Sequence, residues 1–423
     1  MGVANTCVSN SVKRKCGRIV GEKTMSAHTG AAPHLTLEER DLVTQLRDRL
    51  IHVMPEGIPC DLDTDLDLAR WIRGYQRNID RITKIFPVYV ASRKAAGFDR
   101  SDHPERFFDI VQLKPYLPFI ASSRLDDRVW SDEHNAFLFV ERGWSQPKEF
   151  VKAMRSSDYL MHCFGYLEML LQFILRREKA QEENKGPVQF IVLFDLGEVN
   201  LTDYLNPLSA QIRLWQLRSD LWQDWYPEMV QRIFLVNPPR LVSVLWKLAR
   251  MFLNDENCKL IEIVSNKKDL IRYLPSWFVP KEFGGEFINK VPPGDESGAS
   301  RRRKITADDH LRSYEVYRRK GVERPKSTHR DIAPEGSFTC VVDVPSEHAL
   351  LWDFTTNGDV DFAIYANENE HHMVYPRLRL ISTKVPEDGC IEDLPPGQYL
   401  FEFRNHSSFF NLKLDYCISV VPL

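Results

Sequence analysis

Apolar positions recur at two spacings along this chain of 423 residues, and the spacing changes from region to region. Thr36 opens a capping box, a pattern that marks the start of a helix. Apolar residues then recur every three or four positions, with a break at Gly74, as far as about Ala96. The pattern predicts a helical module over residues 36–100, preceded by a flexible tail over residues 1–35.

The middle of the chain alternates short apolar runs with longer stretches of helical spacing. Such alternation is typical of an α/β domain whose parallel strands are buried on both faces. The predicted strands are 136–142, 188–195, 232–237 and 260–264, and the predicted helical regions are 151–177, 207–225 and 241–253.

Beyond residue 330 the pattern alternates apolar and polar residues, as strands with one buried face do. Short, regularly spaced strands in about ninety residues predict an all-β sandwich. The predicted strands are 337–344, 349–355, 360–365, 398–404 and 411–421, with turns at 357–359, 386–389 and 395–397.

Composition limits the classes of function. The net charge of −3 argues against nucleic acid as a partner, and no apolar run approaches the ~20 residues of a membrane span. The eight cysteines are scattered without a CxxC pair, which favours reduced thiols in a cytoplasmic protein. We therefore expect no disulfide framework and no metal site.

The N-terminal tail carries a short pattern for acylation. Gly2 could accept myristate with Thr6 at the required polar position, Cys7 could accept palmitate, and residues 13–15 are basic. Stable anchoring needs two such signals. The tail thus predicts a cytoplasmic protein that associates peripherally with membranes, although so short a pattern also occurs by chance.

Residues 289–328 form a predicted linker of basic character. From 301 to 326 there are ten Lys or Arg residues against four Asp or Glu, a local charge of +6. A surface for anionic lipid is one interpretation. A solvated linker is favoured, because this stretch also has to connect two domains.

Several motifs follow one another between residues 226 and 285. They are Tyr-Pro-Glu at 226–228, Val-Asn-Pro-Pro at 236–239, Phe-Leu at 252–253 and Pro-Lys-Glu-Phe-Gly-Gly at 280–285. Their order resembles the CRAL-TRIO lipid-binding domain, a family that includes phosphatidylinositol and tocopherol transfer proteins and supernatant protein factor. The resemblance implies a lipid-pocket domain over residues 107–288, in which the predicted apolar helix at 241–253 is a gate over the pocket.

The C-terminal region resembles a GOLD domain over residues 329–423. The resemblance rests on four short motifs: Leu-Trp-Asp-Phe at 351–354, Asp-Phe-Ala-Ile at 361–364, Pro-Gly-Gln-Tyr at 396–399 and Arg-Asn-His-Ser-Ser-Phe-Phe at 404–410. It implies a β-sandwich through which a protein partner could bind.

A lipid cavity needs apolar walls and a door. Phe190, Val192 and Phe194 alternate along one predicted strand and so share one face. Each candidate could equally be an ordinary core residue. Other wall candidates, which could join either face, are Leu214, Leu217, Leu221, Phe234 and Val236. The predicted gate consists of Leu241, Val244, Leu245, Leu248 and Phe252.

For the lipid head group, the resemblance implies a lysine near the end of the gate helix, and Arg250 stands at that position. The acidic partner of the family is not kept: its position falls near Leu217, and Asp220 is the closest carboxylate. This departure leaves a more hydrophobic ligand open beside phosphatidylinositol. Asp195, at a strand end, could be catalytic, but a cap or loop anchor is favoured.

Three functions are compatible with these patterns. The first is a lipid-binding or transfer protein with no chemistry, no cofactor and a bound lipid, coupled to membranes or signalling. The second is a membrane-attached scaffold or signalling regulator with a vestigial cavity. The third, an enzyme, is disfavoured because the sequence has no nucleophile elbow, metal-ligand spacing or phosphate loop at a strand–helix junction.

Overall fold

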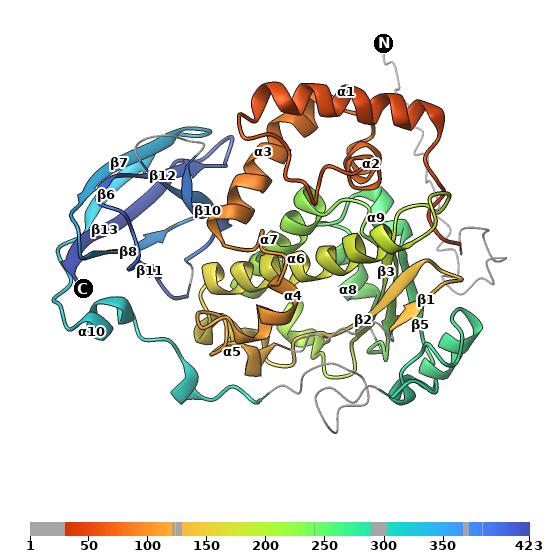
Figure 1. Cartoon of the computed structure of the whole chain (residues 1–423). Coiled ribbons are helices and arrows are strands. Elements are labelled where there is room, and N and C mark those ends of the chain that lie inside the picture. Colours follow the sequence, from red (N-terminus) through yellow and green to blue (C-terminus); the bar gives the residue numbers. More distant parts are fainter. Residues whose placement is uncertain are drawn as a thin grey trace, which may run out of the picture. The chain divides into compact units, whose positions relative to one another are not determined.

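The computed structural model describes residues 30–120, 123, 129–240, 242–288, 303–366, 372–382 and 384–423. Its first region is helical, as the sequence predicts (Figure 1). The Thr36 hydroxyl accepts a hydrogen bond from the Glu39 amide, and the Glu39 carboxylate accepts one from the Thr36 amide. This capping box starts the first of three helices: α1 (Leu37–Val53), α2 (Asp65–Gly74) and α3 (Ile79–Ala95).

A five-stranded sheet forms the centre of the α/β region, in the order β1-β2-β3-β4-β5. Strands β2 to β5 are parallel, and β1 pairs antiparallel with β2. The strands are β1 (Trp130–Ser131), β2 (Ala136–Arg142), β3 (Gln189–Asp195), β4 (Val230–Val236) and β5 (Ile261–Val264). The helices are α4 (His103–Arg106), α5 (Pro147–Ala153), α6 (Ser156–Ala180), α7 (Ala210–Trp225), α8 (Val242–Ala249) and α9 (Asp255–Lys259).

The two faces of this sheet bury different sets of side chains. Phe190 and Val192 of β3 belong to the large apolar cluster that also contains residues of α6 and α7. Ile191 and Leu193 belong to a second cluster, which includes Phe278 and other residues that follow β5. Alternation along the strand therefore sends consecutive residues to opposite faces, as the sequence predicts.

The predicted helical region 151–177 is in fact two helices. α5 ends at Ala153, and α6 begins at Ser156. Arg155 lies between them with an extended backbone (φ −72°, ψ 159°) and caps α6 without a side-chain hydrogen bond. Apolar periodicity continues across this break, so it could not reveal the change of direction.

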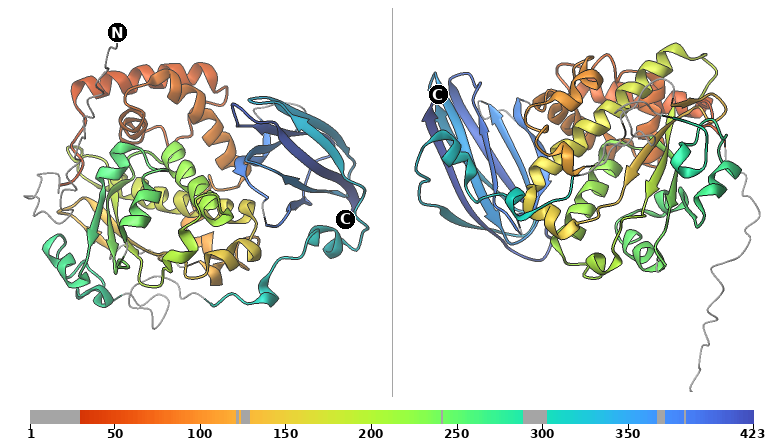
Figure 2. Two further views of the ribbon diagram at one scale, coloured as in Figure 1. Left: turned by 180° about the vertical axis from the view of Figure 1, so that it is seen from behind. Right: turned by 90° about the horizontal axis from the view of Figure 1, so that it is seen from below.

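The C-terminal region consists of two four-stranded sheets, seen from two sides in Figure 2. Their orders are β10-β9-β12-β7 and β11-β8-β13-β6. Phe354 of one sheet contacts Phe362 and Phe403 of the other, with ring centroids 5.0 and 5.3 Å apart. The strands are β6 (Thr328–Ile332), β7 (Ser337–Val344), β8 (His348–Thr356), β9 (Val360–Ala366), β10 (Met373–Leu380), β11 (Glu387–Ile391), β12 (Gly397–Asn405) and β13 (Leu412–Pro422).

Three of these strands, β6, β10 and β11, were not predicted, and the predicted turn at 386–389 is wrong. Most of that stretch is β11, which pairs antiparallel with β8. Glu387 and Asp388 are buried there, so the strand lacks the usual apolar signature. Gly389 also belongs to this strand. A glycine is needed there, because a Cβ atom at that position would lie 2.2 Å from the Trp352 ring.

The basic stretch is more than a solvated linker where the structure describes it. A short helix, α10 (Glu315–Lys320), buries Val316 and Tyr317 in a cluster with residues of β8 and β13. Several cations of the basic stretch form ion pairs with carboxylates of the same chain, which reduces the positive charge available to a membrane. These pairs are Arg303–Asp309, Arg318–Glu315, Lys320–Glu392 and Arg324–Asp353.

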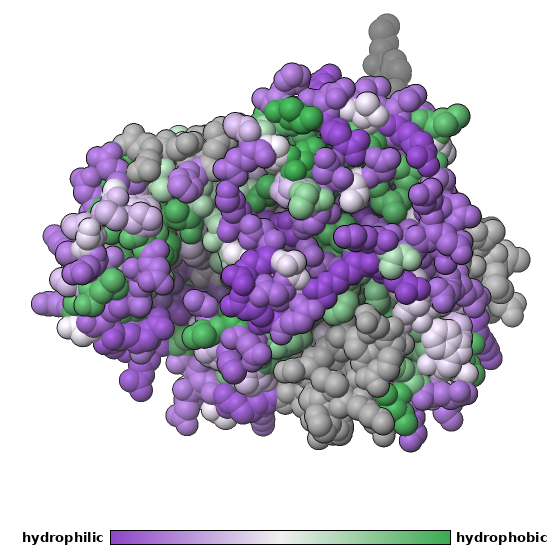
Figure 3. All heavy atoms as spheres, in the orientation of Figure 1, coloured by the Kyte–Doolittle hydropathy of each residue, from purple (hydrophilic) through white to green (hydrophobic). Residues whose placement is uncertain are grey.

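Figure 3 shows hydrophobic residues scattered among hydrophilic ones on one face of the molecule. Within the described ranges, every helix is too short or too polar to cross a bilayer. The two predicted acylation positions, Gly2 and Cys7, lie outside the described residues.

Candidate functional site

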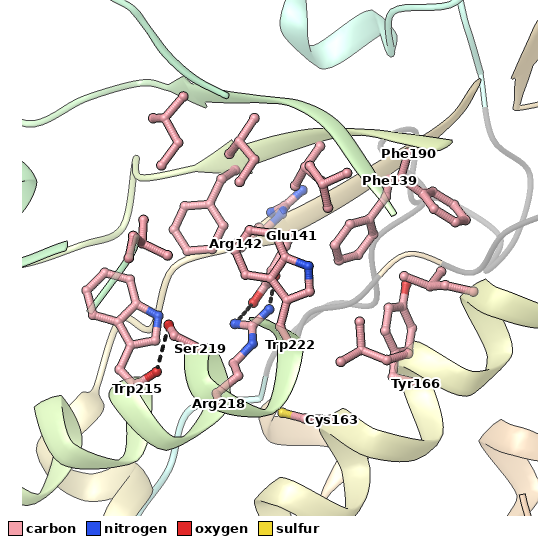
Figure 4. A pocket seen from close by; sticks show the side chains of 18 of the residues that line it. Phe139, Glu141, Arg142, Cys163, Tyr166, Phe190, Trp215, Arg218, Ser219 and Trp222 are labelled. Carbon is pink, nitrogen blue, oxygen red and sulfur yellow. Dashed lines mark hydrogen bonds and ion pairs between the residues drawn. The ribbon is translucent and has the colours of Figure 1, made fainter. Parts of the chain in front are cut away.

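A cavity of about 200 Å³ lies between one face of the sheet and the helices α6 and α7. Most of its walls are aromatic or aliphatic (Figure 4). Phe139 and Phe190 line it from the sheet, and Tyr166 lines it from α6. Trp215 and Trp222 line it from α7. The described residues contain no group of three or more His, Cys, Asp or Glu that could hold a metal.

The structure brings four of the predicted residues together at this cavity: Phe190, Val192, Phe194 and Phe252 all line it. Leu214 and Leu217 are instead buried in the apolar cluster beside it, and Leu221 packs against that cluster. Phe234 and Val236 belong to the cluster on the opposite face of the sheet. Whether the lining residues contact a lipid stays a prediction.

The predicted gate corresponds to α8 and the turn that follows it. Trp246 of α8 and Phe252 and Leu253 of the turn line the cavity. Leu241 lies outside the described residues, as do the side chains of Val244, Leu245 and Leu248. The chain at α8 therefore borders the cavity, while most of the predicted gate side chains stay untested.

Arg250 is exposed, and the lining of the cavity does not include it. Asp220 forms an ion pair with Arg379 of β10 at 3.6 Å. Asp195 accepts hydrogen bonds from the Gly197 amide and the Asn237 side chain, at 2.9 and 2.8 Å, which fits a loop anchor. The cavity obtains its charged groups from other residues.

The charged pair inside the cavity is Arg218 of α7 with Glu141 of β2. Both guanidinium Nη atoms donate to the two oxygens of this carboxylate, as Figure 4 shows. Burial by itself would lower the pKa of Arg218. The charge of Glu141 raises this pKa by more, so that it lies well above its usual value. Arg142, at the same strand end, donates to Glu282 at 3.0 Å. Each cation thus has a carboxylate partner.

The sequence held a signal for Arg218 that its apolar pattern concealed. Leu214, Leu217 and Leu221 form the stripe of α7 that enters the core. Trp215, Arg218 and Trp222 form a second stripe, displaced by one residue, and this stripe faces the cavity. An arginine between two tryptophans at helical spacing indicates a buried, paired cation. Glu141, at the end of a predicted strand, was its available partner.

Helix α6 forms one wall of the cavity and is fixed at its middle by a buried carboxylate. Glu168 accepts hydrogen bonds from Tyr89 (2.6 Å), Arg93 (2.7 Å) and Tyr226 (2.8 Å). Arg93 also pairs with Asp61 at 2.6 Å. The network joins α6 to α3 and to the Tyr-Pro-Glu motif, so the motif has a structural role here.

The first turn of α6 is held by the C-terminal sandwich. Glu387 of β11 accepts hydrogen bonds from the amides of Ser156 and Ser157, at 3.0 and 3.1 Å. Arg155 pairs with the neighbouring Asp388 at 2.7 Å. A carboxyl group at this position satisfies amides that have no partner within the helix. The wall of the cavity therefore depends on residues far along the chain.

Cys163 lines the cavity, and burial raises the pKa of its thiol to about 12. At pH 8 only roughly one thiol in ten thousand is then ionised, and the thiolate is the reactive form. We expect a maleimide to label the exposed Cys60 at least about tenfold faster than Cys163. Peptide mass spectrometry of timed samples measures both rates. Equal rates would mean that water and reagent enter the cavity freely.

Comparisons with known proteins agree with this architecture. The model of the CRAL/TRIO domain family matches residues 142–285, which span the strands β3 to β5 and the helices beside the cavity. The CRAL-TRIO domain-containing protein C34C12.6 of Caenorhabditis elegans is 55% identical over 388 residues, which is 92% of this chain and 97% of the relative. The chain therefore belongs to the CRAL-TRIO family, a family of lipid-binding carriers.

More distant similarities extend over most of the chain. Protein ctg-1 of Caenorhabditis elegans is 25% identical over 376 residues, which is 84% of this chain and 91% of that protein. The crystal structure of Sfh5 covers 69% of this chain and 98% of its own, with a TM-score of 0.40 and 10% identity. That structural likeness is too weak to support a conclusion about function.

Proposed function

We propose that this protein is a lipid carrier, which holds one hydrophobic molecule in the cavity between the sheet and α6 and α7 and performs no chemistry on it. The observation that carries the proposal is the cavity itself, whose lining is largely aromatic and aliphatic. Moving a lipid into such a lining contributes about 0.8 kcal/mol for each buried methylene group. A chain of ten such groups gains on the order of 8 kcal/mol.

A carrier also needs an opening for its lipid, and we place it at the turn after α8, which borders the cavity. Gln223 of α7 donates to the Phe252 carbonyl at 2.9 Å and accepts from the Asn254 amide at 3.0 Å. Phe252 also packs against the apolar cluster that contains Ile212 of α7. Opening here would break a few hydrogen bonds that water can replace, each about 0.5–1.5 kcal/mol, and would expose the Phe252 ring unless a lipid or a membrane covered it.

Peripheral binding to membranes is the second part of the proposal. Arg240, Lys247 and Arg250 are exposed along the segment that contains α8, and Met251 beside them is 64% exposed. Cations and an apolar side chain together favour an anionic lipid surface. Phosphatidylinositol is one candidate cargo, and its phosphate would meet Arg250 outside the cavity. Acylation at Gly2 and Cys7 would strengthen the attachment.

Native mass spectrometry of the full chain, purified without detergent, tests the carrier function. We expect a lipid bound at one molecule per chain, and its extraction would identify it. A protein that is empty, and that takes up neither phosphatidylinositol nor tocopherol from vesicles, would contradict the proposal.

Val192→Trp is expected to reduce lipid uptake by at least about tenfold, because the indole would occupy the cavity that Val192 lines. Uptake from vesicles with a fluorescent lipid measures the effect. Val341→Trp is the matched control, since Val341 is 43% exposed on β7 and its substitution adds the same side chain at the surface. Equal uptake by both variants would show that lipid binds elsewhere.

One observation favours a scaffold as a second candidate function. Phe409 and Phe410, between β12 and β13, are 85% and 76% exposed. Adjacent exposed aromatic side chains are typical of surfaces that bind another protein. The resemblance of this sandwich to a GOLD domain supports a protein partner and a role in signalling. An empty cavity, together with loss of a copurifying partner in Phe409→Ser/Phe410→Ser, would favour the scaffold.

A further inference from the structure

His162 is a residue of the cavity lining whose side chain leaves its hydrogen-bonding capacity unused. It lies on α6, between Tyr159 and Tyr166, and only 3% of it is exposed. Neither ring nitrogen has a hydrogen-bond partner among the residues that the structure describes. His103 offers a contrast, because its Nε2 lies 2.7 Å from the Gly165 carbonyl oxygen. Two unmet polar atoms on one buried ring oppose folding.

The imidazole of His162 is uncharged at physiological pH. Burial lowers its pKa to about 3, and the charge of Arg218 lowers it further. A neutral imidazole presents one donor and one acceptor. The rings of Phe107 and Tyr166 pack against it, with centroids 5.2 and 6.1 Å away, and hold it in place. His162 can thus bind a hydroxyl or a carbonyl group, but not an anion by charge.

The cations of the cavity argue against a phosphate inside it. Arg218 is paired with Glu141, and Arg142 with Glu282. A phosphate that displaced Glu141 from Arg218 would leave a largely buried carboxylate without its partner, which is strongly unfavourable. The volume of about 200 Å³ is also below the ~300–1,000 Å³ of typical ligand pockets. A single chain or ring system would already need the walls to move apart, and two acyl chains would need them to move farther.

We propose that the cavity is built for an uncharged lipid with a hydroxyl or carbonyl group, and that this group hydrogen-bonds to His162. The cargo is one ring system or one chain with a single polar group, in preference to a phospholipid. This inference rests on the proposed carrier function and specifies its ligand class. It gives α6 a role in selecting the cargo as well as in enclosing it.

The test removes the hydrogen bond from each side in turn. Phosphatidylcholine vesicles carry one test lipid at a time, and uptake by the full chain is measured. The test lipids are two alcohols, each with its hydrocarbon counterpart (cholesterol with cholestane, hexadecanol with hexadecane), and phosphatidylinositol. We expect the wild type to take up at least one of the two alcohols about tenfold better than its hydrocarbon, which corresponds to about 1.4 kcal/mol. It should also prefer that alcohol to phosphatidylinositol. In His162→Leu the preference for the alcohol over its hydrocarbon should disappear.

Two further variants separate binding from structural damage. His162→Gln keeps a donor and an acceptor and should retain most of the preference. His134→Leu also removes a buried histidine with an unpaired nitrogen, but this residue packs against Phe278 and does not line the cavity. It should leave uptake unchanged. The thermal midpoint of His162→Leu should equal or exceed that of the wild type, because the variant removes unmet polar atoms.

The outcomes distinguish this inference from the carrier function beneath it. If His162→Leu discriminates alcohol from hydrocarbon as the wild type does, His162 is not the contact. If the wild type prefers phosphatidylinositol, the protein is a carrier but the proposed ligand class is wrong. If the wild type takes up none of these lipids, the carrier function itself fails.

Discussion

Arg93→Met is expected to lower the free energy of unfolding by about 3–5 kcal/mol. Arg93 is 1% exposed, and the Glu168 carboxylate that it contacts is fully buried on α6. Methionine keeps most of the apolar stem but leaves this carboxylate with two tyrosine hydroxyls and no cation. Urea unfolding followed by tryptophan fluorescence measures the loss.

Arg49→Met makes the same substitution in a pair that faces solvent. Arg49 and its partner Asp80 are 59% and 76% exposed, so water replaces the contact and stability should hardly change. A loss below about 1 kcal/mol in Arg93→Met would mean that water reaches Glu168, and that the middle of α6 is not the fixed wall we describe.

The stability that the Glu387 carboxyl contributes is expected to decline as the pH rises from 5 to 8. Burial raises the pKa of Glu387 from 4.5 to about 7, although the hydrogen bonds from Ser157 and Ser156 oppose this rise. Between these two values the folded state holds a proton that the unfolded state releases, so stability falls with increasing pH. The contribution is complete below 4.5 and lost above about 7, with a size on the order of 3 kcal/mol.

The measurement compares the wild type with Glu387→Gln at each pH, because other groups titrate as well. Burial lowers the pKa of His103 and His134, and such histidines add stability as the pH rises. Asp67, whose pKa burial raises to about 7, acts in the same direction as Glu387. These contributions cancel in the difference between the two proteins. A difference that stays constant or grows with pH would show that Glu387 is ionised in the folded state.

The sheet was predictable from sequence because its signal is local. Strands β2 to β5 are apolar runs bounded by polar residues, and the predicted limits differ from the observed ones by no more than two residues. Burial on both faces requires such runs whatever lies above them. The same reasoning placed Phe190 and Val192 on the face that lines the cavity.

The rest of the site depends on contacts that no local pattern contains. β11 was mistaken for a turn because its buried residues are acidic, and they are buried only because Ser156 and Arg155 meet them there. His162 carried no sign of its isolation, since an unpaired nitrogen is defined by what surrounds it. Arg250 was selected by resemblance, whereas the cations that line the cavity are Arg142 at the end of β2 and Arg218 on α7.

The cap of α6 has a consequence for how the protein is made. Glu387 follows Ser156 by 231 residues, so a ribosome needs roughly 10–50 s to reach it after the first turn of the helix has been synthesised. During that interval the first amides of α6 can bind only water. The helix that lines the cavity is therefore completed by one of the last strands to be translated, and a nascent chain cut short before β11 would carry an unfinished cavity wall.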